Sequence, residues 1–108
     1  MPATRVLFIC LGNSCRSPMA EALARHFGPD VIEASSAGLM ALGYVAAPTQ
    51  AVLDESGIAS QGLLSKPLRM IDLSFIDLVV NLSGRPIEKY LDGRGLPVED
   101  WDVGDPFG

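Results

Sequence analysis

Histidine, cysteine and basic residues are scarce in this sequence of 108 residues. The single histidine is His26, and the two cysteines are Cys10 and Cys15. A structural zinc site needs about four ligands, and a disulfide scaffold needs more cysteines, so neither is expected. Lys and Arg number 8 against 13 Asp and Glu, which gives a formal net charge of −5. The chain therefore lacks the basic surface that a nucleic-acid partner requires.

Long apolar runs are also missing. No stretch approaches the roughly 20 residues of a membrane-spanning helix. The short apolar run at residues 6–11 is followed by Gly-Asn-Ser-Cys-Arg rather than by a small-residue cleavage site. We expect no membrane partner and no secretory signal, and a cytoplasmic location by default. The hydrophobic fraction of 48% indicates a packed core, and the length fits one domain over residues 1–108.

Short apolar runs alternate with segments of helical composition. The runs at residues 5–10, 31–36, 77–82 and 98–103 predict strands. Residues 17–27 and 49–56 predict helices, the first capped by Ser17, and residues 68–74 and 86–91 predict short helical turns. This alternation predicts a three-layer α/β fold with an open sheet of about four parallel strands. Ligands of such sheets bind beyond the carboxyl ends of the strands, where Cys10 is expected.

The segment between the first strand and the first helix is the most informative in the chain. It reads Cys10-Leu11-Gly12-Asn13-Ser14-Cys15-Arg16-Ser17-Pro18. Gly12 permits a positive φ, and Asn13 tolerates the left-handed region better than most residues. A short loop of this kind can point several backbone N–H groups inward, and the helix dipole adds partial positive charge at the same place. The segment therefore predicts an anion-binding loop.

Three side chains of this loop predict chemistry as well as binding. Inward amides favour the thiolate form of Cys10, which makes it a nucleophile. The planar fork of Arg16 can hold two oxygens of a tetrahedral oxyanion, and Ser17 can donate a hydrogen bond to the sulfur. Each residue alone has an ordinary explanation, such as a small buried cysteine or a solvated arginine. Their joint occurrence between a strand and a helix favours a nucleophile aimed at a phosphate-like group.

A carboxylic acid near the end of the chain completes the expected chemistry. Phosphoryl transfer to sulfur releases a leaving group that must be protonated. Asp105 precedes Pro106 and so is expected in an extended, projecting conformation. It can then activate water against the phosphocysteine. Asp102 is a rival acid, although the strand predicted before it favours a structural role.

These motifs together resemble the low-molecular-weight protein tyrosine phosphatases, a superfamily that includes bacterial arginine phosphatases and thioredoxin-coupled arsenate reductases. The resemblance rests on the loop from Cys10 to Pro18, on Ser36-Ala37-Gly38 and on Asp105-Pro106, and it covers essentially the whole chain. It implies a phosphotyrosine phosphatase I-like fold and an enzyme that needs no metal or other cofactor.

The resemblance also implies a role for each matching residue. Cys10 is the expected nucleophile, and Asp105 the general acid and then the general base. Asn13 holds the loop in shape, bonded to Ser36, and Cys15 can form a reversible disulfide with Cys10. Arg16 is expected to assist catalysis as well as to bind substrate. The expected substrate-binding residues are Leu11, Gly12, Asn13, Ser14, Cys15, Arg16 and Ser17.

Two departures from the family bear on the reaction. Ser14 stands where tyrosine phosphatases often carry a bulky aliphatic residue, which weakens a claim specific for tyrosine. Residues 81–85, Asn-Leu-Ser-Gly-Arg, contain none of the relay cysteines of the best-known arsenate reductases. We therefore expect hydrolysis of phosphorylated protein residues. The alternatives are an arsenate reductase that uses an external thiol reductant, and a weakly active oxyanion-binding or redox-sensing module.

A third departure concerns the end of the sequence. Gly108 comes three residues after Asp105, whereas family members usually continue into a C-terminal helix that covers one face of the sheet. The apolar face near Val6, Phe8 and Val79 is then expected to be partly uncovered. An exposed patch of this kind favours a partner. We therefore expect a chain that lacks this helix. Either the chain is truncated, or it forms a homodimer that covers the face.

Overall fold

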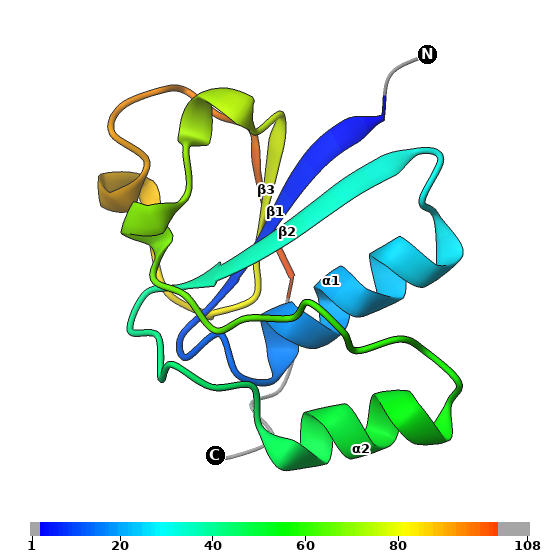
Figure 1. The fold of residues 1–108 in the computed structure, drawn as a ribbon. Helices are drawn as coiled ribbons and strands as arrows, with labels where there is room; N and C mark the ends of the chain where they lie inside the picture. Colours follow the sequence, from blue (N-terminus) through cyan, green and yellow to red (C-terminus); the bar gives the residue numbers. More distant parts are fainter. Residues whose placement is uncertain (1–2, 102–108) are drawn as a thin grey trace.

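A four-stranded parallel sheet forms the centre of the molecule in a computed structural model (Figure 1). The structure describes residues 3–101. Its strands are β1 (Thr4–Cys10), β2 (Ile32–Gly38), β3 (Leu78–Asn81) and β4 (Val98–Asp100), in the order β2-β1-β3-β4. All neighbouring pairs are parallel. The prediction of about four parallel strands is confirmed. β2 extends two residues further than expected, to Gly38, because it pairs with β1 as far as Cys10.

Helical segments cover both faces of the sheet. The helices α1 (Arg16–Phe27) and α2 (Ala47–Glu55) lie on one side (Figure 1). Three short 3-10 helices, η1 (Leu68–Met70), η2 (Leu73–Phe75) and η3 (Glu88–Tyr90), lie on the other. The predicted three-layer α/β fold is therefore confirmed. Neither α-helix of residues 3–101 is long and apolar enough to cross a lipid bilayer.

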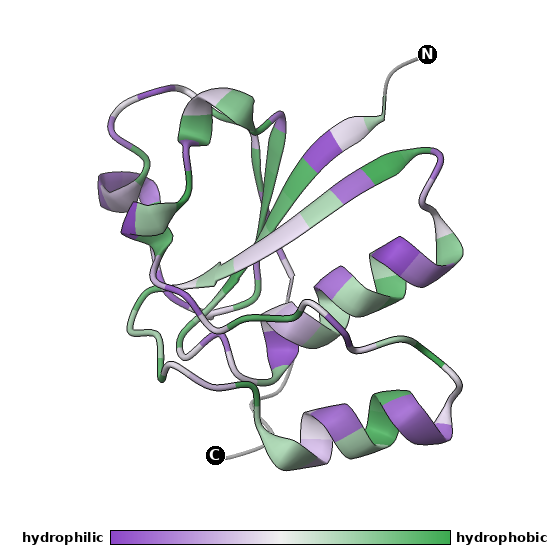
Figure 2. Ribbon diagram, in the orientation of Figure 1, coloured by the Kyte–Doolittle hydropathy of each residue, from purple (hydrophilic) through white to green (hydrophobic). Residues whose placement is uncertain are grey.

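The strands are buried on both faces, which explains their continuous apolar runs. Figure 2 shows β1 and β3 coloured as hydrophobic along most of their lengths. Leu7 and Ile9 point toward the 3-10 helices, whereas Val6 and Phe8 point toward α1, because successive side chains of a strand alternate between faces. The sheet thus separates two apolar clusters.

One expectation about the sheet surface is wrong. Val6, Phe8 and Val79 are only 4%, 5% and 0% exposed. Val79 also faces the side opposite to Val6 and Phe8, because it lies beside Leu7 in the strand register. On the α1 side, the ring of Trp101 packs edge-on against Phe8 with the centroids 6.2 Å apart. Because these side chains are buried, the reason for expecting a homodimer no longer holds. The missing C-terminal helix was expected at the end of the chain, which lies outside residues 3–101.

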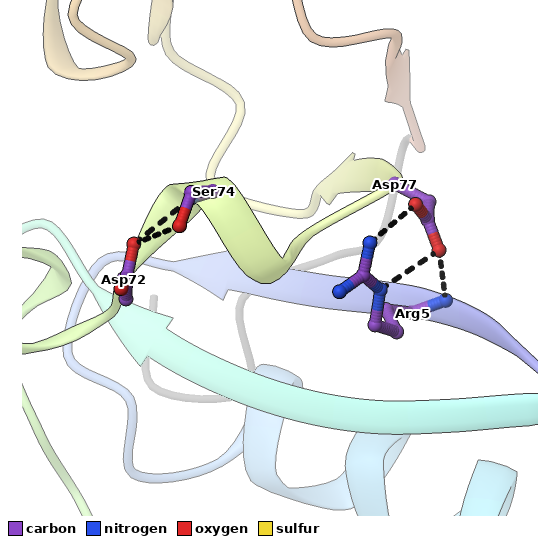
Figure 3. Close-up of polar contacts among 4 residues, drawn as sticks. All are labelled: Arg5, Asp72, Ser74 and Asp77. Carbon is purple, nitrogen blue, oxygen red and sulfur yellow. Dashed lines mark hydrogen bonds and ion pairs between the residues drawn. The ribbon is translucent and has the colours of Figure 1, made fainter.

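An ion pair joins the start of β1 to the approach to β3 (Figure 3). The carboxylate of Asp77 accepts three hydrogen bonds from Arg5, from its backbone N at 2.8 Å, from Nε at 3.2 Å and from Nη2 at 3.1 Å. The backbone N of Asp77 donates to the Arg5 carbonyl at 2.8 Å. These hydrogen bonds from Arg5 hold the pKa of Asp77 below its usual range. Nearby, the hydroxyl and amide of Ser74 lower the pKa of Asp72 in the same way (Figure 3).

The substitution Asp77→Asn is expected to lower stability at neutral pH by a modest amount, because the ion pair is exposed to solvent and screened. Since folding lowers the pKa of Asp77, its contribution is present above the usual carboxyl pKa of about 4 and is lost as the pH falls through the folded-state pKa. Urea unfolding between pH 3 and pH 7 measures this. Asp30→Asn, at an exposed aspartate in the turn before β2, is the control. A deficit for Asp77→Asn that does not shrink at low pH would contradict the assignment.

Candidate active site

Backbone hydrogen bonds hold the loop between β1 and α1 in shape. Residues 39–46, which we call the bracing segment, run alongside residues 10–15. Four amides of the bracing segment donate to four loop carbonyls, Leu39 to Cys10 at 3.1 Å, Met40 to Leu11 at 2.8 Å, Leu42 to Gly12 at 2.9 Å and Ala46 to Ser14 at 2.8 Å. The hydroxyls of Thr49 and Ser65 donate to two of the same carbonyls, at 3.2 and 3.1 Å. The loop carbonyls are therefore directed away from the loop centre.

The loop amides consequently point inward. In a trans peptide the N–H of one residue is directed opposite to the carbonyl of the residue before it, and residues 3–101 contain no cis peptide. The amide opposite the braced Gly12 carbonyl belongs to Asn13, and it donates to Cys10 Sγ at 3.2 Å. Such a ring of amides forms an anion-binding concavity. The bracing segment thus produces the arrangement that the loop sequence predicts.

Cys10 lies at the carboxyl end of β1, where its side chain is 2% exposed. Ser17 Oγ lies 2.9 Å from its sulfur. Because Asn13 Nδ2 donates to this hydroxyl at 2.7 Å, the hydroxyl hydrogen is directed elsewhere, and the sulfur is its closest acceptor. With a thiolate on Cys10, Ser17 must be the donor. A thiolate on Cys10 therefore receives hydrogen bonds from a backbone amide and a hydroxyl.

Ser17 does not cap α1, which corrects one prediction. The residue before the helix is Cys15, and no side chain makes a capping hydrogen bond there. Ser17 lies inside the first turn and is fully buried, with its hydroxyl turned toward Cys10. The positive end of the helix is thereby left directed toward the loop, where a bound anion is favoured.

Asn13 fixes the loop from within. Its φ of 47° is left-handed, as expected, and its side chain is completely buried. The amide nitrogen also donates to Ser36 Oγ at 3.0 Å, so the hydrogen bond that the resemblance implies is present. The amide oxygen accepts from the backbone N of Lys66 at 2.8 Å. One side chain thus connects the loop to β2 and to the segment before η1.

Two glycines lie where a neighbouring segment approaches closely, and the approach is tightest at Gly38. Gly12 does not have the positive φ that we predicted. A Cβ there would lie 3.1 Å from Cγ of Leu42 in the bracing segment. At Gly38 a Cβ would lie 2.8 Å from the Leu11 carbonyl oxygen and 2.9 Å from Asn13. The Ser-Ala-Gly motif therefore ends in glycine because the end of β2 packs directly against the loop.

A buried carboxylate lies behind this network and was not predicted. Glu21 is 2% exposed, accepts a hydrogen bond from Ser36 Oγ and pairs with Arg25. The sequence did offer a signal for its burial, because Glu21 lies four residues after Ser17 and so on the same face of the helix. Lys66 is half-buried, and this burial lowers its pKa, although Glu21 opposes the shift. These residues support the loop without lining it.

Arg16 begins α1 and faces the end of β3. Its Nη1 donates to the Leu82 carbonyl at 2.6 Å. Arg16 also borders a hollow of about 300 Å³ beside the loop. The residues that line the hollow are Cys10, Leu11, Gly12, Ser14, Cys15, Arg16, Met40 and Leu42. The structure thus brings most of the predicted binding set together, whereas the side chains of Asn13 and Ser17 are buried behind it. Asp105 and Asp102 lie outside the described residues.

Comparisons with known proteins agree with this geometry. The family described as low molecular weight phosphotyrosine protein phosphatase matches residues 5–108. The glutaredoxin arsenate reductase of Synechocystis sp. is 33% identical over 96% of this chain and 79% of its own length. The low molecular weight protein-tyrosine-phosphatase YfkJ of Bacillus subtilis is 37% identical over 76% of this chain and 58% of its own length. A solved arsenate reductase in its phosphate-binding state superposes with a TM-score of 0.83 at 32% identity, over 96% of this chain and 79% of that protein.

Replacing Ser36 with alanine tests the buried support of the loop. Ser36→Ala removes the hydroxyl that joins the Asn13 amide to Glu21. It is expected to lower the free energy of unfolding by about 1–3 kcal/mol, because two buried polar groups lose a partner. Urea unfolding at neutral pH measures the change. The matched control is Ser35→Ala, one position earlier in β2 and only partly buried. Equal, small effects of the two substitutions would show that the network does not stabilise the fold.

Proposed function

This chain belongs to the low molecular weight phosphotyrosine protein phosphatase family, and we propose that it hydrolyses phosphorylated protein residues, phosphotyrosine or phosphoarginine, through a phosphocysteine on Cys10. The observation that carries the proposal is the setting of the Cys10 sulfur. It accepts a hydrogen bond from the Asn13 amide, contacts the Ser17 hydroxyl and borders a hollow of about 300 Å³. That hollow has room for a phosphate group.

In the first step the Cys10 thiolate attacks the phosphorus of the bound phosphoryl group. A sulfur–phosphorus bond forms, and the bond from phosphorus to the leaving oxygen or nitrogen breaks. The inward amides of the loop and the guanidinium of Arg16 hold the phosphoryl oxygens and stabilise their charge in the transition state. Asp105, assigned from the sequence, gives its proton to the leaving group.

In the second step the same carboxylate acts as a base. It takes a proton from a water molecule, whose oxygen attacks the phosphocysteine. The sulfur–phosphorus bond breaks, and inorganic phosphate and the Cys10 thiolate are released. Ser17 stabilises the departing thiolate through its hydroxyl, 2.9 Å from the sulfur. The cycle needs no redox partner, because no atom changes its oxidation state.

Arsenate reduction is the second candidate. The similarity to arsenate reductases favours it. The small Ser14 that lines the hollow also favours it, because the family resemblance implies a serine at this position in many arsenate reductases. Arsenate must gain two electrons to become arsenite. In this chain they can come from an external thiol acting with Cys10, or from Cys10 and Cys15 as these two thiols are oxidised to a disulfide. The turn after β3 carries Ser83 rather than a cysteine. We therefore favour hydrolysis.

Assays of one protein preparation with four substrates, run side by side, decide among these functions. The substrates are p-nitrophenyl phosphate, a phosphotyrosine peptide, a phosphoarginine peptide and arsenate with a thiol. Steady release of phosphate, inhibited competitively by vanadate, supports the proposal. Arsenite production that depends on thiol supports the second candidate. Binding of phosphate without any turnover indicates an oxyanion-binding or redox-sensing module and overturns both.

Replacing Cys10 with serine is expected to reduce turnover of p-nitrophenyl phosphate by at least about three orders of magnitude, because a neutral hydroxyl is a far weaker nucleophile. Phosphate affinity is expected to persist, since the loop amides and Arg16 remain. Isothermal titration with phosphate, together with circular dichroism, shows that the variant is folded and still binds the anion. Turnover near the level of the unmodified protein would remove Cys10 as the nucleophile.

Asp105→Asn is expected to slow the reaction according to the leaving group. Good phenolic leaving groups need little protonation, whereas alkyl and amide-type leaving groups are expected to lose about 10²–10⁴-fold. The rates of a series of aryl and alkyl phosphates measure this. The matched variant is Asp102→Asn, at the neighbouring acid. A uniform loss at Asp105, or a dependence on the leaving group seen only at Asp102, assigns the acid differently.

A further inference from the structure

A second hollow adjoins the loop hollow on the side of η3. Its volume is about 650 Å³. The residues that line it are Leu11, Leu39, Met40, Arg85, Pro86, Glu88, Lys89 and Tyr90. Leu11 and Met40 border both hollows. A ligand that fills the loop hollow and continues past these two side chains therefore enters the second space, which we call the adjoining hollow.

Arg85 is held in the adjoining hollow by its backbone. Its carbonyl accepts a hydrogen bond from Asn81 Nδ2 at 2.7 Å, and its amide donates to Ser83 Oγ at 3.1 Å. Asn81 is itself 3% exposed and also donates to Asp100 Oδ1 at 2.8 Å. Gly84, with a φ of 74°, allows the tight turn. The position of Arg85 is thus fixed through atoms that a side-chain substitution leaves in place.

The adjoining hollow carries an excess of positive charge. Arg85 and Lys89 line it together with one carboxylate, that of Glu88. The ammonium of Lys89 lies 5.2 Å from the centroid of the Tyr90 ring, which keeps it near the wall formed by η3. The whole chain has a net charge of −5, so this local excess runs against the general charge of the protein. An anionic group is the complementary ligand.

We propose that the adjoining hollow binds an acidic side chain of a substrate peptide while the phosphorylated residue of that peptide occupies the loop hollow. The proposal rests on the proposed phosphatase function and adds a sequence preference to it. A small aryl phosphate fills only the loop hollow, whereas a peptide extends beyond it on both sides of the phosphorylated residue. Arg85 and Lys89 then contribute to substrate affinity and leave the chemical step unchanged.

The experiment compares two phosphotyrosine peptides that differ only in their flanking residues, glutamate in one and glutamine in the other. The unmodified protein is expected to show a lower KM for the glutamate peptide, by about two- to five-fold for each exposed cation. The double variant Arg85→Gln/Lys89→Gln is expected to lose this preference, with kcat unchanged for both peptides and for p-nitrophenyl phosphate. The preference is also expected to weaken at high salt.

Arg94→Gln is the matched control, because it removes one positive charge from the same segment at a residue that does not line the hollow. It is expected to keep the preference. A charge reversal, Lys89→Glu, is expected to turn the preference toward a peptide with flanking lysines. The proposal is overturned if the unmodified protein treats the two peptides alike, or if the double variant still prefers the acidic one.

Failure of the proposed function gives a different result. In that case no peptide and no aryl phosphate is hydrolysed by any variant. Binding of the same peptides to the Cys10→Ser protein, followed by fluorescence anisotropy, still measures the preference directly, because the anion-binding loop remains in this variant. Equal affinities there for the glutamate and glutamine peptides would count against the adjoining hollow alone.

Discussion

The site depends on the outward bracing of the loop carbonyls after β1. Four backbone amides of residues 39–46 and two hydroxyls donate hydrogen bonds to these carbonyls. Because the peptides are planar and trans, the loop amides then point inward. The amide of Asn13 reaches the Cys10 sulfur as a direct result. Without the bracing segment, nothing would hold the loop carbonyls outward, and the loop amides would not converge on one point. The anion-binding shape of the loop is thus a consequence of backbone geometry more than of any single side chain.

The end of β3 connects the two hollows. The Leu82 carbonyl accepts a hydrogen bond from Arg16, and Asn81 holds the backbone of Arg85 in the turn that follows. The end of one short strand therefore contacts Arg16, which lines the loop hollow, and holds the backbone of Arg85, which lines the adjoining hollow. Because β3 pairs with β1 over four residues, these positions are tied to that of Cys10. A rigid sheet can hold such groups more accurately than a free loop.

Much of the fold and part of the site could be predicted from the sequence. The apolar runs identified all four strands, and the segment from Cys10 to Pro18 identified the anion-binding loop. The predictions failed where a residue has two possible roles. Serine is a common helix cap, but the hydroxyl of Ser17 lies beside the Cys10 sulfur instead. Glycine is common in left-handed turns, but Gly12 has no positive φ and lies close to Leu42. The local sequence allows both roles, and only the neighbouring segments choose between them.

The sequence by itself determined which residues carry chemistry and where they stand along the chain, because hydrophobic periodicity and a short spaced motif are local properties. The tertiary structure decided how those residues meet. The contacts that brace the loop join positions about 30–50 residues apart, and local propensity carries no information about such pairs. The burial of Glu21, the half-burial of Lys66 and the hollow beside Arg85 arise in the same way. They exist only once the strands are in register and the segments between them are packed on the two faces of the sheet.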